Sequence, residues 1–358
     1  MLDRQQAFSG TREVAPALAF DAGRLAAYLG ARVAGFAGPV EVRQFKGGQS
    51  NPTYLVTTAD RAYVLRRKPP GKLLPSAHAV DREYRVLAAL GKAGFPVPRV
   101  HLYCDDAEVI GTPFYLMDRV EGRVVWVPSM PGATAAERAA TYADMGRVIA
   151  ELHRFDPVEL GLGDFGKGQD YVARQAARWS TQYLASKTDD IAAMDRLIAW
   201  LPDHLPPPAP VRIVHGDYRL DNLILDAAAP KVIAVLDWEL STLGDPIADF
   251  SYHAMQWIMP PTEDGSGTGS LVGLDLDALA IPRLEPYVAA YEAATGLTVA
   301  PYLDRYFAYN LFRLAAILQG IVGRVRDGTA TNAAAAAMAN QVRPLAEAGW
   351  HFAERVRA

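Results

Sequence analysis

A polar loop between two apolar segments contains the residues best suited to chemistry. Asp217 follows His215 and Gly216, Asn222 comes five positions later, and Asp237 stands at the end of the next apolar run. Phosphoryl transfer needs a carboxylate that orients or deprotonates the acceptor hydroxyl, and it needs oxygen ligands for Mg²⁺. Asp217 can supply the carboxylate, while Asn222 and Asp237 can supply the ligands. The pattern therefore predicts transfer of the γ-phosphoryl group of Mg-ATP.

The combined pattern resembles the aminoglycoside phosphotransferase and choline kinase family. His-x-Asp with Asn five positions later is the spacing of a protein-kinase catalytic loop, and a later Asp at a strand end matches its second metal ligand. The branch-specific matches are Gly216, Trp238 and the string Gly244-Asp245-Pro246. The resemblance covers about residues 40–330. It implies an α+β, bilobal protein-kinase-like fold, with an antiparallel-sheet N-lobe over residues 1–120 and a mainly helical C-lobe over residues 121–358.

The same resemblance implies a site for ATP and Mg²⁺. The turn with Gly47, Gly48, Ser50 and Asn51 matches the family's phosphate-covering loop, where glycine permits close backbone approach. Without the downstream motif, a glycine-rich hairpin would indicate only a turn. The residues that match the adenine-binding hinge are Met117, Asp118 and Val120.

The phosphate-contacting lysine of this family is replaced. The matching position holds Arg66, whose guanidinium is always charged and can contact phosphates in a bidentate manner. Lys68 is an alternative candidate for the phosphate-contacting residue. Glu83, on the following predicted helix, is the candidate ion-pair partner of Arg66.

Other charged residues flank the catalytic motif. Arg219 is predicted to neutralise charge on the moving phosphoryl group or, equally well, to brace the loop. We expect His215 to order the loop rather than to catalyse. Asp245 and Asp249 are expected to cap or brace the loop of Asp237 and the helix over residues 247–258.

The acceptor is predicted to be a small-molecule hydroxyl. The segments 63–71 and 242–246 look closest to the kinase-like domain that accompanies acyl-CoA dehydrogenases, which implies a hydroxyacyl-CoA acceptor and an acyl-CoA dehydrogenase as a candidate partner. The run Arg66-Arg67-Lys68, with Lys72, is a candidate contact for CoA phosphates.

Three other functions are compatible with parts of the sequence. A non-catalytic nucleotide-binding pseudokinase, or a regulatory partner of an acyl-CoA-metabolising enzyme, is favoured only by the missing lysine. An antibiotic or amino-alcohol kinase would need acidic or aromatic contacts, and the sequence has no convincing cluster of these. A protein kinase is disfavoured because Asp237 and Asp245 stand too close for a peptide-docking segment.

Composition narrows the class of protein. The 358 residues carry a net charge of −4 and a single cysteine, so no nucleic-acid partner, disulfide framework or multi-cysteine metal site is expected. Cys104 is expected to be a small buried hydrophobe. Residues 1–10 do not resemble a signal peptide, and the most apolar segment, 314–325, is too short to span a membrane. A cytoplasmic protein is expected, and a homodimer is left open.

Periodicity predicts the elements that position these motifs. An antiparallel meander is predicted over residues 40–45, 53–58 and 61–67, then a helix over 79–93, two strands over 100–103 and 113–120, and a hinge at Glu121-Gly122. Later helices are predicted at 134–155, with a Thr134–Glu137 capping box, at 170–184, at 190–201 and from 282 onward. Short strands at 211–214, 223–225 and 232–236 would hold the catalytic loop.

Overall fold

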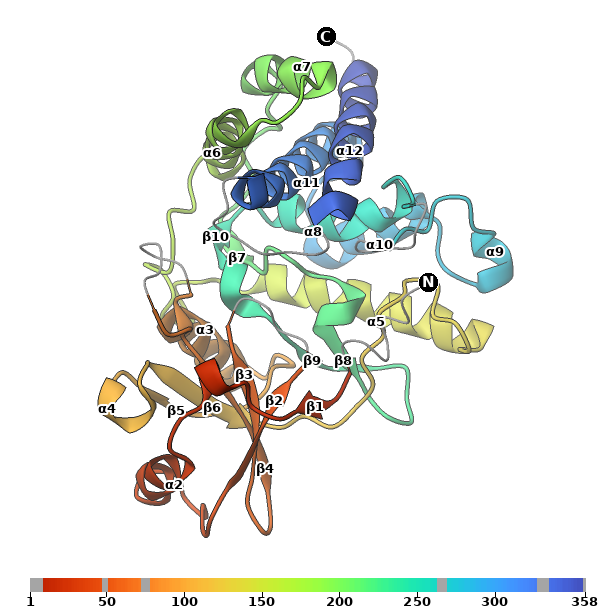
Figure 1. Cartoon of the computed structure of the whole chain (residues 1–358). Coiled ribbons are helices and arrows are strands. Elements are labelled where there is room, and N and C mark those ends of the chain that lie inside the picture. The colour runs from red at the N-terminus through yellow and green to blue at the C-terminus, as the bar shows by residue number, and fades with distance from the viewer. Residues whose placement is uncertain (1–8, 47–50, 72–77, 263–268, 327–334, 357–358) are drawn as a thin grey trace. The chain divides into compact units, whose positions relative to one another are not determined.

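The computed structural model describes the chain except residues 1–8, 47–50, 72–77, 263–268, 327–334 and 357–358 (Figure 1). Gly47, Gly48, Ser50 and Lys72 therefore lie outside the described residues. Two compact units alternate along the sequence. The sheet unit comprises Met1–Trp126, Leu160–Leu162 and Asp221–Ser241, and the helical unit comprises Val127–Glu159, Gly163–Leu220 and Thr242–Ala358. A lobe boundary at residues 120 and 121 stays a prediction.

The sheet unit is built on six antiparallel strands in the order β1-β2-β3-β4-β6-β5. The predicted meander and the two following strands are confirmed. The strands are β1 Thr11–Arg12, β2 Glu41–Phe45, β3 Thr53–Thr57, β4 Ala62–Arg67, β5 Val100–Cys104 and β6 Phe114–Asp118. The helices of this unit are α2 Ala22–Gly30, α3 Val80–Lys92 and α4 Ala107–Ile110. Of these, α3 was predicted, whereas α2, α4 and the two-residue β1 were not.

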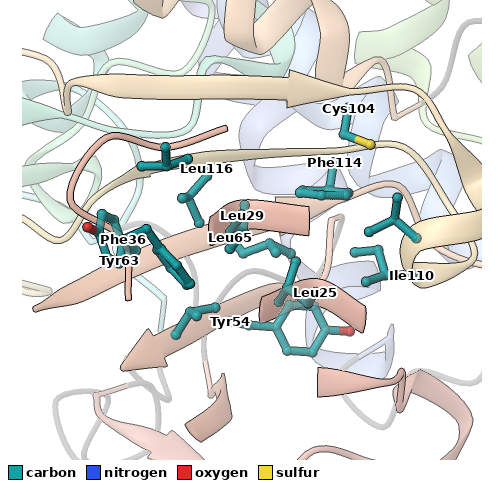
Figure 2. Close-up of a cluster of buried hydrophobic side chains, with 13 residues drawn as sticks. Leu25, Leu29, Phe36, Tyr54, Tyr63, Leu65, Cys104, Ile110, Phe114 and Leu116 are labelled. Atoms are coloured by element: carbon teal, nitrogen blue, oxygen red, sulfur yellow. The ribbon is translucent and has the colours of Figure 1, made fainter. Parts of the chain in front are cut away.

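One face of this sheet is covered by a hydrophobic cluster that includes α2 (Figure 2). Successive strand residues point to opposite faces, so every second side chain of a strand enters the cluster. Its labelled members are Leu25, Leu29, Phe36, Tyr54, Tyr63, Leu65, Cys104, Ile110, Phe114 and Leu116. The predicted burial of Cys104 is confirmed, and its thiol is free.

Two adjacent arginines of β4 are buried on opposite sides of the sheet. Arg67 donates hydrogen bonds to the carbonyl oxygens of Leu18 and Ile110 and lies over the ring of Phe20. Arg66 ion-pairs with Glu83 of α3 instead. Both guanidinium groups are thus held inside the protein, so the prediction that Arg66 and Arg67 meet CoA phosphates as one basic run is wrong.

A hairpin formed by β8 Leu223–Leu225 and β9 Val232–Val235 also belongs to the sheet unit. Gly122, predicted as a hinge, packs directly against this hairpin. A Cβ atom at residue 122 would lie 2.3 Å from the carbonyl oxygen of Leu225 and 2.5 Å from Cγ2 of Ile224. Glycine is required here because the two backbone segments approach so closely.

The helical unit confirms the predicted change of class after the sheet. Its helices are α5 Ala135–Arg154, α6 Tyr171–Ser186, α7 Ala192–Trp200, α8 Pro246–Ala254, α9 Leu276–Leu279, α10 Leu284–Thr295, α11 Leu303–Arg326 and α12 Ala335–Arg355. Two short strands, β7 Arg212–Val214 and β10 Thr242–Gly244, pair antiparallel. The α+β class, with an antiparallel sheet followed by a mainly helical part, is therefore confirmed.

Local capping explains where two helices begin. The predicted capping box of α5 is present, with Thr134 and Glu137 bonding reciprocally. Asp245 caps α8 by accepting hydrogen bonds from the backbone N–H groups of Ile247 and Ala248. α8 ends at Ala254, earlier than predicted, and a 3-10 turn follows it. Among the described helices, none is both long and apolar enough to cross a membrane.

Gly122→Ala should destabilise the protein, because the added methyl group would meet a backbone carbonyl that cannot rotate away. We expect a loss of about 2 kcal/mol or more in the free energy of unfolding, measured by urea denaturation. Gly30→Ala is the matched control, since no atom lies within 4 Å of its Cβ position. Equal effects of the two substitutions would contradict the packing account.

Candidate active site

Arg66 is the centre of the charged group in the sheet unit. Its Nη2 donates to Oδ1 of Asp237 at 2.7 Å and to Oε2 of Glu239 at 3.1 Å. Its Nε lies 3.0 Å from Oε2 of Glu83, so the predicted Arg66–Glu83 ion pair is formed. Arg66, not Lys68, occupies the position beside this glutamate. The guanidinium therefore joins strand β4, helix α3 and the segment that follows β9.

The charge balance of this group leans negative, because three carboxylates share one guanidinium. Burial alone lowers the pKa of Arg66, but Glu83, Asp237 and Glu239 outweigh that effect and raise it well above its usual range. Burial raises the pKa of Glu83 from 4.5 to about 7, against the opposing effect of Arg66. The nearby charges of Asp237 and Glu239 add to this increase.

Glu83 is held by neutral hydrogen bonds as well. Asn51 is fully buried, and its Nδ2 donates to Oε1 of Glu83 at 2.7 Å. Tyr115 Oη donates to Oε2 of Glu83 at 3.0 Å, and Oδ1 of Asn51 lies 2.9 Å from Nδ1 of His78. The side chain of Asn51, predicted to meet the nucleotide, is thus engaged with protein partners. Tyr115 was not predicted as a site residue, because it lies in a continuously apolar and buried stretch of β6 that resembles core.

The β8–β9 hairpin brings the two predicted metal ligands to one end of a sheet. Leu223 pairs with Val235, and the N–H of Leu236 donates to the carbonyl oxygen of Asn222 at 2.8 Å. Asn222 is thereby placed opposite the residue that precedes Asp237. Asp237 adopts a left-handed backbone, with φ of 63°, which turns the chain sharply at the end of β9. Strained residues of this kind cluster at functional sites.

The oxygen ligands at this hairpin suit a magnesium–nucleotide complex. Mg²⁺ typically takes one or two protein carboxylates and completes its shell with phosphate oxygens and water. Among the described residues, no group of three or more His, Cys, Asp or Glu side chains is arranged to hold a metal ion. A site that shares its ligands with a nucleotide needs fewer protein groups, and the excess negative charge beside Asp237 favours a divalent cation.

The helical unit contains the first part of the predicted catalytic motif, from His215 to Leu220. Oδ1 of Asp217 accepts a hydrogen bond from Tyr252 Oη at 3.0 Å and lies 3.6 Å from Nε of Arg219. The N–H of Asp217 donates to Nδ1 of the fully buried His215 at 3.2 Å. His215 therefore orders the loop, as predicted. The contact of Tyr252 with Asp217 was not predicted, because a tyrosine within an apolar helix is typical of a core residue.

Asp249 braces the start of the catalytic motif. Its two carboxylate oxygens accept hydrogen bonds from the backbone N–H groups of His215 and Gly216 at 2.7 and 2.8 Å. Nε2 of His153 lies 3.1 Å from Oδ2. Burial alone would raise the pKa of Asp249, but these donors and the two histidines lower it. The prediction that Asp249 braces the loop of Asp237 is therefore corrected.

Arg313 is a buried arginine of the helical unit that was not predicted from the sequence. It lies in α11, and its Nη2 donates to the carbonyl oxygen of Gly216 at 3.0 Å. Its guanidinium carbon lies 4.9 Å from the centroid of the Tyr252 ring. In the sequence, Arg313 stands out only as a charged residue directly before the apolar segment 314–325. This position does not indicate that its guanidinium bonds to the backbone of Gly216.

The predicted adenine hinge lies at the end of β6 in the sheet unit. Met117 is buried and pairs with Val64 of β4, while Asp118 pairs with Tyr63. Oδ1 of Asp118 lies 2.6 Å from Nε2 of His101. Val120 follows the end of the strand. These positions leave the predicted adenine contacts as a proposal.

Comparison with known proteins identifies the family. Residues 41–305 match the phosphotransferase enzyme family, which includes the aminoglycoside phosphotransferases. The chain belongs to this family. It is also 42% identical over 353 residues to acyl-CoA dehydrogenase family member 11 of Gallus gallus, covering 97% of this chain and 45% of that protein. The chain therefore spans less than half the length of this relative. Both predicted resemblances are confirmed.

Solved structures show the same fold for this phosphotransferase chain. A Ralstonia eutropha protein, to which an aminoglycoside phosphotransferase activity is provisionally ascribed, is 46% identical with a TM-score of 0.86, covering 95% of this chain and 100% of that one. A spectinomycin phosphotransferase in complex with ADP and spectinomycin is 10% identical with a TM-score of 0.60, covering 93% and 98% of the two chains. The second likeness concerns the fold alone.

Glu83→Gln should change how stability depends on pH. Because the folded protein raises the pKa of Glu83 from 4.5 to about 7, the stability contribution is fully present below pH 4.5 and is lost as the pH rises toward 7. The wild type should lose up to about 3 kcal/mol relative to Glu83→Gln over this interval, measured by urea unfolding at several pH values. Glu121→Gln, at an exposed glutamate, is the control. A constant difference between wild type and Glu83→Gln would show that Glu83 does not titrate there.

Proposed function

We propose that the protein is an ATP- and Mg²⁺-dependent phosphotransferase that phosphorylates a hydroxyl group of a small molecule, with a hydroxyacyl-CoA as the acceptor. One observation carries the proposal: Arg66 is ion-paired with Glu83 and Asp237 in the same unit. In kinases, a basic residue paired with a helix glutamate contacts the phosphates, and an aspartate holds the metal. The ion pairs of Arg66 with Glu83 and Asp237 support the same two roles in this chain, with arginine in place of lysine.

The sheet unit supplies the nucleotide-binding residues in this proposal. Asn222 and Asp237 would hold Mg²⁺, which when bound neutralises charge on the phosphate oxygens. Arg66 would contact the phosphates through its guanidinium. The remaining proposed contacts are Gly47, Gly48 and Ser50, which lie outside the described residues, the backbone of Asn51, and the hinge residues Met117, Asp118 and Val120.

The helical unit supplies the groups that act on the acceptor. Asp217 orients the acceptor hydroxyl and accepts its proton as the oxygen attacks the γ-phosphorus. Arg219 offsets negative charge on the transferred group. Its ion pair with Asp217, at 3.6 Å, supports a role close to that carboxylate.

The acceptor class rests on the relatives. The matched region of the Gallus gallus protein belongs to a longer chain named after acyl-CoA dehydrogenase. A kinase that accompanies such an enzyme would act on an acyl-CoA carrying a hydroxyl group. We accordingly propose an acyl-CoA dehydrogenase as the functional partner. Because Arg66 and Arg67 lie on opposite sides of the sheet, they cannot bind CoA phosphates together, and we propose that other residues contribute.

An acceptor panel tests this assignment. Wild-type protein with Mg-ATP should release ADP in the presence of a hydroxyacyl-CoA, and the same acyl-CoA without the hydroxyl should give only background. An aminoglycoside and an amino alcohol complete the panel. Release of ADP with one of these instead would reassign the acceptor, and release with none, despite nucleotide binding, would favour a pseudokinase.

Two aspartate variants separate binding from chemistry. Asp217→Asn should retain Mg-dependent nucleotide binding and lose at least about 100-fold in turnover, because only the proton acceptor is removed. Asp237→Ala should lose both, because a metal ligand is removed. Thermal shift with Mg-ATP measures binding, and ADP release measures turnover. Full activity of Asp217→Asn would disprove the assignment of the base.

A further inference from the structure

We propose that Tyr252 is a positioning residue for Asp217. The inference rests on the proposed phosphotransferase activity. Tyr252 lies in α8, is buried, and donates its hydroxyl to Oδ1 of Asp217 at 3.0 Å. It follows Asp217 by 35 residues, so the contact is tertiary. The hydroxyl thus fixes one oxygen of the carboxylate that is assigned as the proton acceptor.

Arg313 contacts both Tyr252 and the loop that carries Asp217. Its guanidinium lies over the face of the Tyr252 ring, with 4.9 Å between its central carbon and the ring centroid. The same side chain donates to the carbonyl oxygen of Gly216, the residue before Asp217, at 3.0 Å. Cation–π attraction and this hydrogen bond both restrict the tyrosine ring relative to the loop. Arg313 is itself buried in α11, so its planar fork cannot move freely.

A neutral donor on a catalytic carboxylate restricts rotation of the carboxylate, which keeps the second oxygen aimed in a constant direction. Burial raises the pKa of the Tyr252 hydroxyl well above its usual range, so the residue stays a donor throughout the working pH range.

A second buried tyrosine–aspartate hydrogen bond in the helical unit serves as a control for the Tyr252–Asp217 bond. Tyr306 donates its hydroxyl to Oδ2 of Asp245 at 2.7 Å, and both residues are buried in the helical unit. Asp245 caps α8 through its other oxygen. Loss of the Tyr306 hydroxyl should therefore affect stability alone, whereas loss of the Tyr252 hydroxyl should affect the carboxylate that takes the proton.

The test compares Tyr252→Phe with Tyr306→Phe in the full chain, using ADP release with the best acceptor of the panel. Tyr252→Phe should lower kcat between about 10-fold and 100-fold and leave the KM for ATP within about twofold. Tyr306→Phe should keep kcat within about twofold. Thermal unfolding confirms that both variants fold.

A double variant separates positioning from a general structural effect. If Tyr252 acts through Asp217, adding Tyr252→Phe to Asp217→Asn should cause no further loss of kcat. Multiplicative losses, or a Tyr252→Phe variant that keeps the wild-type kcat, would overturn the inference while leaving the phosphotransferase in place. An inactive wild type, with every acceptor tested, would overturn the proposed function and this inference together.

Discussion

The sheet unit depends on the burial of one guanidinium group among three carboxylates. Arg66 comes from the middle of the sheet, Glu83 from α3, and Asp237 and Glu239 from a segment more than 150 residues later. A buried charge that lost these partners would be strongly unfavourable, so the three segments must remain together. The same requirement fixes the end of the β8–β9 hairpin, where the carbonyl oxygen of Asn222 accepts a hydrogen bond from Leu236, the residue before Asp237. Structural constraint and proposed metal binding therefore share one set of residues.

In the helical unit, buried charged side chains bond to the backbone of a loop instead of to one another. There, a buried carboxylate, Asp249, gathers backbone N–H groups of the catalytic motif. Arg313 gathers the carbonyl oxygen of Gly216 in the same motif. Donors and acceptors of a short loop are thus satisfied by ionised side chains from the helices α8 and α11. A loop held in this manner leaves Asp217 with little freedom, as the proposed proton transfer to its carboxylate would require.

The sequence could predict parts of this arrangement whose signals are local. The spacing from His215 to Asp237 predicted the motif, alternation predicted the sheet, and the Thr134 capping box predicted the start of α5. The destination of Asp249 could not be predicted, because its carboxylate folds back by more than 30 residues to the backbone of residues 215 and 216. The opposite orientation of Arg66 and Arg67 could have been predicted from the sequence. Neighbouring residues of a strand face opposite sides, so the two arginines could not form one phosphate-binding run.

The central claim is that the carboxylates around Arg66 accept a nucleotide together with a divalent cation. Calorimetric titration of the wild-type chain with AMP-PNP, with and without Mg²⁺, tests it most directly. The excess negative charge beside Asp237 should repel free triphosphate and attract the magnesium complex. We therefore predict that affinity is at least about 10-fold higher with Mg²⁺, equivalent to about 1.4 kcal/mol. Equal affinity with and without the metal, or no binding in either case, would contradict the account.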